Sequence, residues 1–142
     1  MNSREKDEER KFELIWKKNW MLLAEFNDWM LGRGLSKRTS HMHLSNVTMY
    51  MQEYLMYDGP LPPANGTIGI GMYLGSWFIR KAPYASPGTV RSNATSIVKF
   101  YSFLLEKGLI TPGALEQMRE SIRLDMRKWQ ERARQAKIPP QI

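Results

Sequence analysis

Residues 86–110 read SPGTVRSNATSIVKFYSFLLEKGLI, and this stretch carries the signals of one complete helix. Ser86 is a favourable N-cap, Pro87 suits the first helical position, and Gly108 stands where a helix of about twenty residues would end. Three- and four-residue spacing predicts a buried apolar stripe of Val90, Ala94, Ile97, Tyr101, Leu104 and Leu105. The other side carries Arg91, Ser92, Thr95, Lys99 and Ser102. Taken alone, that polar side is either a solvated face or a surface for an anion.

The composition predicts one soluble, cytoplasmic domain. The chain has 142 residues, of which 42% are hydrophobic, enough for one core and too few for two domains. No apolar run is long enough to cross a membrane, and the charged N-terminus does not resemble a signal peptide. The chain has no cysteine, which excludes disulfides, thiolate catalysis and cysteine zinc sites.

The positive charge is unevenly distributed along the chain. The formal net charge is +7, yet residues 1–34 carry seven basic and seven acidic side chains. No Asp or Glu occurs in residues 35–52 or in residues 59–105. Because soluble helical proteins usually mix both signs on their surfaces, these acid-free stretches indicate a phosphate-rich partner.

Gly and Pro residues divide the chain into five predicted helices, at about 8–31, 36–57, 67–81, 86–105 and 111–138. The expected fold is all-α, an orthogonal bundle of four to five helices. The third helix contains Gly69, Gly71 and Gly75, each of which weakens a helix by about 1 kcal/mol. We therefore expect tertiary packing to hold this helix, with the glycines allowing another helix to approach closely.

Two of these helices share a form: a loop, a Ser cap, basic and hydroxyl residues, and then an aromatic-rich stripe. They read GLSKRTSHMHLSNVTMYMQEYL at 34–55 and SPGTVRSNATSIVKFYSFLLEKGLI at 86–110, with LLAEFNDWMLGRGLS at 22–36 before them. In order and spacing they resemble the N-terminal core-binding domain of tyrosine recombinases, the phage-integrase family, which has a SAM-like helical fold. The resemblance covers about residues 20–110. Residues 1–19 then form a charged extension of the first helix, and residues 111–142 form an additional helix and tail.

The resemblance implies a module that forms half of a clamp around duplex DNA during DNA integration and recombination. It also implies that the second and fourth helices approach the DNA. The matching positions are Lys37, Arg38, Thr39, His41, Thr89, Arg91, Ser92, Thr95 and Lys99. The residue types agree, since helix N-termini, Lys and Arg bind phosphates, and hydroxyls fix register. Thr39 and Thr89 have a second interpretation, in which each completes the cap of its helix.

The chemistry of strand cleavage is absent from this sequence. Recombinases use a constellation of arginines and histidine with a tyrosine nucleophile, whereas this chain has two histidines, both in the second helix. His43 stands where the family usually has Tyr, so we expect a core histidine. His41 lies two positions away on a diverging face, which excludes a shared metal. We therefore predict no catalysis, no metal and no cofactor.

The additional helix has two interpretations. Its apolar stripe of Leu115, Met118, Ile122, Met126, Trp129 and Ala133 is typical of a helix packed on its own bundle. Phe12 and Trp16 of the N-terminal extension are candidate contacts for it. In the alternative, the helix docks onto a recombinase partner or a second copy and DNA binding has been lost. The five tryptophans and ten methionines favour such an interface.

Overall fold

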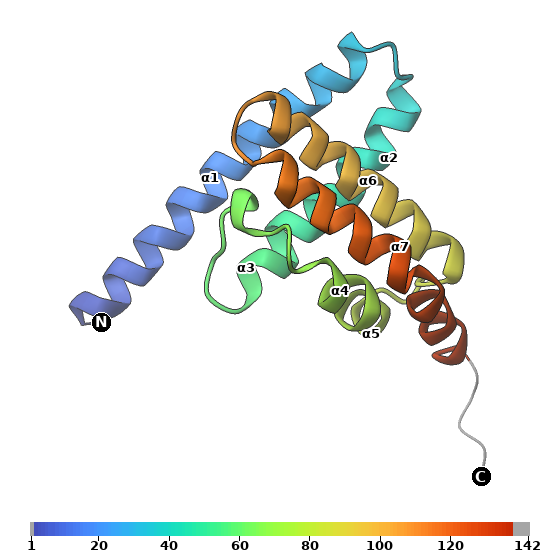
Figure 1. Cartoon of the computed structure of the whole chain (residues 1–142). Coiled ribbons are helices and arrows are strands. Elements are labelled where there is room, and N and C mark those ends of the chain that lie inside the picture. The colour runs from blue at the N-terminus through green and yellow to red at the C-terminus, as the bar shows by residue number, and fades with distance from the viewer. Residues whose placement is uncertain (1, 138–142) are drawn as a thin grey trace. The chain divides into compact units, whose positions relative to one another are not determined.

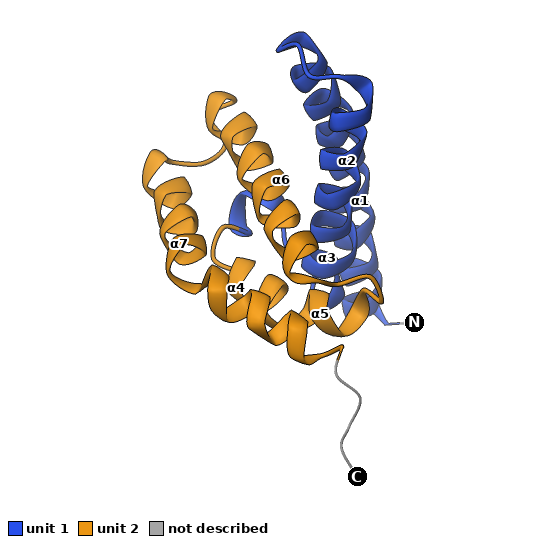
Figure 2. Cartoon of the chain, turned by 90° about the vertical axis from the view of Figure 1, so that its right-hand side faces the viewer, with its two compact units in different colours: residues 1–66 blue, residues 67–142 orange. Residues whose placement is uncertain are grey.

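A computed structural model describes residues 2–137, and every regular element in that range is a helix (Figure 1). The all-α prediction is therefore confirmed. The chain divides into two compact units, residues 1–66 (unit 1) and residues 67–142 (unit 2), coloured separately in Figure 2. The boundary falls inside the segment 20–110 that the sequence treated as one piece.

Unit 1 begins with a 30-residue helix, α1 (Ser3–Gly32). The prediction that this helix begins near Glu8 is wrong, because Asn2 caps it. The Asn2 side chain accepts a hydrogen bond from the Glu5 amide at 2.8 Å, and the Glu5 carboxylate accepts one from the Asn2 amide at 3.4 Å. This reciprocal capping box satisfies two of the orphan amides and holds the charged first turns in the helix.

The second predicted helix of unit 1 is continuous but changes winding. It runs from α2 (Lys37–Thr48) through a π-helical segment (Met49–Tyr54) to α3 (Leu55–Tyr57). Its expected stripe faces inward: His43, Val47, Tyr50 and Met51 are buried and Tyr54 is half-buried. His43 is 5% exposed, which confirms that it is a core histidine.

A buried polar contact joins α1 to the π-helical segment. Asn19 is 1% exposed and donates from Nδ2 to Gln52 Oε1 at 2.7 Å. Gln52 in turn donates from Nε2 to the backbone oxygen of Trp16 at 3.2 Å. Because a buried amide without a partner is costly, this pair fixes the register of the two helices.

A hydrogen bond from Tyr50 attaches the loop that follows α3 to the core of unit 1. It contains a short 3₁₀ helix (Pro63–Asn65), and the hydroxyl of Tyr50 donates a hydrogen bond to the backbone oxygen of Gly66. Burial, with a smaller contribution from Tyr54, raises the pKa of Tyr50 far above its ordinary value, so the hydroxyl stays protonated and able to donate.

Unit 2 contains the three remaining predicted helices. The first comprises α4 (Ile70–Met72), a π-helical segment (Tyr73–Trp77) and α5 (Phe78–Lys81). It begins three residues later than predicted, because Thr67 and Ile68 form a turn. The others are α6 (Pro87–Glu106) and α7 (Pro112–Gln135), capped by Ser86 and Thr111 as predicted.

The end of α6 is also as predicted. Gly108 has φ +75°, a left-handed conformation that glycine adopts without strain, and its amide donates to the Leu105 oxygen at 3.0 Å. This turn reverses the chain, so α7 runs back along α6 (Figure 1). Five of the six stripe residues of α6 are buried, and Leu105 is half-buried.

Trp129 anchors α7 against the glycine-rich helix of unit 2. Its side chain is 2% exposed and lies over Gly75, where an added Cβ would come within 2.8 Å of its Cδ1. Arg132, on the next turn, donates to the backbone oxygen of Gly75 at 3.2 Å. The prediction that α7 packs within its own chain is confirmed, as is the close approach expected at Gly75. A contact of α7 with Phe12 and Trp16 stays a prediction.

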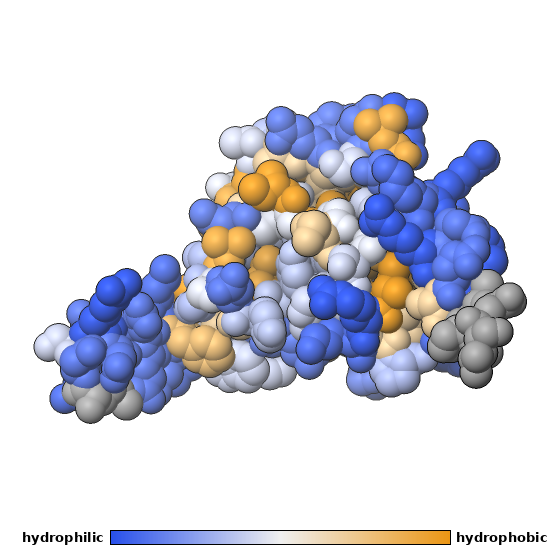
Figure 3. All heavy atoms as spheres, turned by 90° about the horizontal axis from the view of Figure 1, so that it is seen from below, coloured by the Kyte–Doolittle hydropathy of each residue, from blue (hydrophilic) through white to orange (hydrophobic). Residues whose placement is uncertain are grey.

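The surface carries scattered apolar side chains. In the view of Figure 3 they appear as separate orange groups among hydrophilic residues. Ile68 is the most exposed of the large apolar residues in the described range, at 84%. None of the helices formed by residues 2–137 is long and apolar enough to cross a membrane.

The packing of Trp129 predicts different effects on stability for two Gly-to-Ala substitutions in the same helix. Gly75→Ala would force a displacement of Trp129 and should lower the free energy of unfolding by about 1–2 kcal/mol, after the helix-propensity gain is subtracted. Gly71→Ala is the control, because its Cβ would lie at an ordinary 3.8 Å from Trp129. It should leave the free energy unchanged or raise it by up to about 1 kcal/mol. Urea denaturation measures both, and equal effects would contradict this packing.

Candidate nucleic-acid interface

The net positive charge of the chain belongs entirely to unit 2. Residues 1–66 contain nine basic and nine acidic side chains, whereas residues 67–142 contain twelve basic and five acidic ones. The two ranges cover the whole chain, so the +7 excess is that of unit 2 alone. A surface with this excess of positive charge attracts polyanions.

Most acids of unit 2 are already paired. Its five carboxylates are Glu106 at the end of α6 and four on α7. Three of those four form ion pairs along α7: Glu120 with Arg123, Asp125 with Lys128, and Glu131 with Arg134. The hydrogen bond from Arg123 lowers the pKa of Glu120, and the hydrogen bond from Gln135, followed by the charge of Arg134, lowers that of Glu131. Each of the three carboxylates thus has a cation beside it on the same helix.

The polar face of α6 carries five of the predicted site residues. Arg91 and Thr95 are exposed, whereas Thr89, Ser92 and Lys99 are half-buried. Thr95 lies one turn after Arg91 and donates its hydroxyl to the Arg91 backbone oxygen at 3.1 Å. Because this hydroxyl donates its proton, its oxygen can still accept a hydrogen bond from water or from an arginine.

Thr89 completes the cap of α6. Its Oγ1 accepts from the Ser86 amide at 2.8 Å, and its own amide donates to Ser86 Oγ at 3.1 Å. The Thr89 hydroxyl is thus bonded to the Ser86 backbone and the Thr89 amide to the Ser86 side chain, so the cap interpretation holds for this residue. Thr39 is placed similarly in unit 1, where its amide donates to Ser36 Oγ at 3.1 Å, but its side chain remains exposed.

The other predicted residues lie on the first turns of α2 in unit 1. Lys37, Arg38, Thr39 and His41 are all exposed there. Lys37 and His41 are one turn apart and line a shallow hollow of about 320 Å³ together with Asn27, Leu31 and Leu44. The structure therefore groups the nine predicted residues into two sets, four in unit 1 and five in unit 2.

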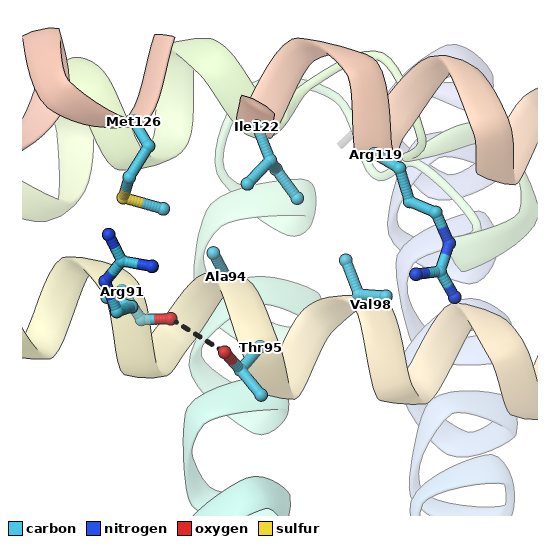
Figure 4. A pocket seen from close by; sticks show the side chains of 7 residues that line it. All are labelled: Arg91, Ala94, Thr95, Val98, Arg119, Ile122 and Met126. Carbon is cyan, nitrogen blue, oxygen red and sulfur yellow. Dashed lines mark hydrogen bonds between the residues drawn. The ribbon is translucent and has the colours of Figure 1, made fainter. Parts of the chain in front are cut away.

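A second hollow, of about 260 Å³, lies between α6 and α7 (Figure 4). Its lining comprises Arg91, Ala94, Thr95, Val98, Arg119, Ile122 and Met126. Figure 4 shows Arg91 at one end, opposite Met126, and Arg119 at the other end, beside Val98. Among residues 2–137, neither guanidinium forms an ion pair with a carboxylate.

Arg119 is the residue that sequence reasoning missed. It lies on a helix with mixed charges, outside the acid-free stretches, so nothing in the local sequence distinguishes it from its neighbours. The available signal was its position next to the apolar stripe, directly after Met118. On a helix predicted to turn back along α6, such a flanking arginine faces the neighbouring helix.

The described residues offer no metal centre, since residues 2–137 contain no group of three His, Cys, Asp or Glu side chains able to hold a metal ion. A scan of family models, a search of curated proteins and a search of solved structures find no match to this chain. The support for a nucleic-acid interface is therefore the charge and the geometry of these residues.

The cap geometry predicts different roles for two threonines of α6. Thr89→Ala removes the hydroxyl that pairs with the Ser86 amide and should lower the free energy of unfolding by about 1 kcal/mol. Thr95→Ala removes an exposed hydroxyl that donates to the Arg91 backbone oxygen within the same helix. This change should alter the free energy of unfolding by less than about 0.5 kcal/mol. Thermal and chemical denaturation compare the two variants. Equal destabilisation by both would contradict the assignment of Thr89 to the cap.

Proposed function

We propose that this chain is a non-catalytic module that binds duplex DNA, mainly through the phosphate backbone. We further propose that its helices adopt the SAM-like, orthogonal arrangement of the tyrosine recombinase core-binding domains that the sequence resembles. In that case its role lies in DNA integration or recombination in the cytoplasm, and strand cleavage belongs to another domain or to a recombinase partner.

One observation carries the proposal: the entire net charge of the chain lies in unit 2, where α6 presents basic and hydroxyl side chains without a carboxylate until Glu106. Arg91 and Lys99 lie eight residues apart on this helix, which places them about 80° apart around it and about 12 Å apart along its axis. A DNA strand carries one phosphate per 3.4 Å of helix axis, so both cations reach phosphates of one strand.

The first turn of α2 supplies a second set of contacts in the proposal. Lys37 and Arg38 are exposed beside the free amides of the helix N-terminus, a combination that favours phosphate. His41 adds a donor one turn later. Because these groups address the backbone, sequence preference should be modest.

The alternative is a protein-interaction module in which a partner or a second copy docks on α7. Trp129 is buried within unit 2, so its side chain is not part of a surface on which a second copy could dock. Sedimentation measures self-association, and a monomer would remove the main reason for the homodimer.

The proposal predicts a weaker salt dependence for a double variant of α6. Arg91→Ala with Lys99→Ala should reduce the slope of log affinity against log salt by about 0.9 for each lost phosphate contact. Lys17→Ala with Lys18→Ala is the matched control, because it removes the same charge from exposed positions on α1 in the neutral unit. Fluorescence anisotropy with a short duplex, titrated at several salt concentrations, measures both slopes. An unchanged slope in the α6 variant, or an equal change in the control, would show that this face does not hold DNA.

A further inference from the structure

We infer that the hollow between α6 and α7 holds a stretch of one sugar–phosphate strand of duplex DNA, with Arg119 of the additional helix as a phosphate contact. This inference rests on the proposed function and extends it. In this inference α7 is part of the binding surface as well as of the fold, and the molecule bound in the hollow is duplex DNA.

The spacing of the two guanidinium groups fits a strand of nucleic acid. Arg91 lies opposite Met126 at one end of the hollow, and Arg119 lies beside Val98 at the other end (Figure 4). On α6 Val98 follows Arg91 by seven residues, and on α7 Met126 follows Arg119 by seven residues. Seven residues of α-helix rise about 10 Å. At one phosphate per 3.4 Å of axis, a strand lying along the hollow places about three nucleotides between its two ends.

The charge state of both ends suits phosphate. Neither Arg91 nor Arg119 is compensated by a carboxylate among residues 2–137, while three of the four acids of α7 are paired with other cations. A planar guanidinium can bind two oxygens of one phosphate at once. The two arginines therefore meet the bound strand without breaking an existing ion pair.

The floor of the hollow distinguishes between classes of nucleic acid. It is aliphatic, formed by Ala94, Val98, Ile122 and Met126, and no aromatic side chain lines it. Proteins that hold single strands use aromatic side chains as stacking platforms for the bases. An aliphatic floor instead suits the carbon face of deoxyribose, so the geometry favours the backbone of a duplex over the bases of a single strand.

Arg119→Ala tests the inference directly in the full chain. With a duplex probe of about 20 base pairs at about 50 to 200 mM salt, the variant should lose about 0.9 of salt slope. Lys128→Ala is the matched control: it lies nine residues along α7, on the opposite side of the helix, and forms an ion pair with Asp125. It should keep the wild-type slope within half that amount. Arg119 is exposed, so circular dichroism should show both variants folded.

The outcomes separate this inference from the proposed function. If Arg119→Ala behaves like Lys128→Ala while Arg91→Ala with Lys99→Ala still loses slope, the hollow is unused and DNA binding by α6 stands. If none of these variants differs from wild type, or wild type binds no duplex, both proposals fail. The assignment of the occupant is overturned if a single strand of equal length binds as tightly as the duplex. It is also overturned if a glutamate-rich peptide of equal charge displaces the duplex as well as unlabelled duplex does.

Discussion

The contact between Trp129 and Gly75 is the constraint on which the architecture of unit 2 depends. A side chain at position 75 would occupy the space of the indole, so only glycine lets α7 come this close to the π-helical segment. The buried indole supplies a large apolar area, and Arg132 fastens the same turn to the Gly75 oxygen. The contact with Gly75 holds one side of α7, and the turn at Gly108 directs α7 back along α6. The hollow with its two arginines lies between these two helices.

The charge distribution of unit 2 opposes its own stability and serves its proposed partner. Unit 2 has twelve cations against five acids, so its excess positive charges repel one another, and the ion pairs along α7 offset only part of that repulsion. Those pairs are exposed, so each contributes little to folding. They pair three of the four acids of α7 with cations other than Arg91 and Arg119, and neither of these arginines forms an ion pair among residues 2–137.

The helices could be predicted from the sequence because the residues at their ends determine where each helix begins and ends. Ser36, Ser86 and Thr111 cap their helices through side-chain oxygens, and Gly108 ends α6 with a positive φ. The start of α1 was missed because its cap, Asn2, precedes a run of charges with no apolar period. The two π-helical segments were missed because each keeps a helical spacing of aromatic residues, so the pattern does not reveal the wider winding.

The candidate site could be predicted only in part, for a related reason. The site residues on α2 and α6 could be predicted because they follow a cap residue and lie in stretches without acids, and both features can be recognised in the sequence. Arg119 becomes relevant only through tertiary packing, as do Asn19 and Gln52, whose polar side chains are buried by meeting each other across 33 positions. The division of the chain at residue 66 is likewise a property of the contacts within each unit.

The salt dependence of duplex binding by the wild-type chain tests the central claim most directly. If Arg91, Lys99 and Arg119 each displace a counterion, log affinity should fall against log salt with a slope of about −3 or steeper, and the first turn of α2 adds to it. A slope shallower than about −1, or no detectable duplex binding at low salt, would contradict the claim that unit 2 is a phosphate-binding surface.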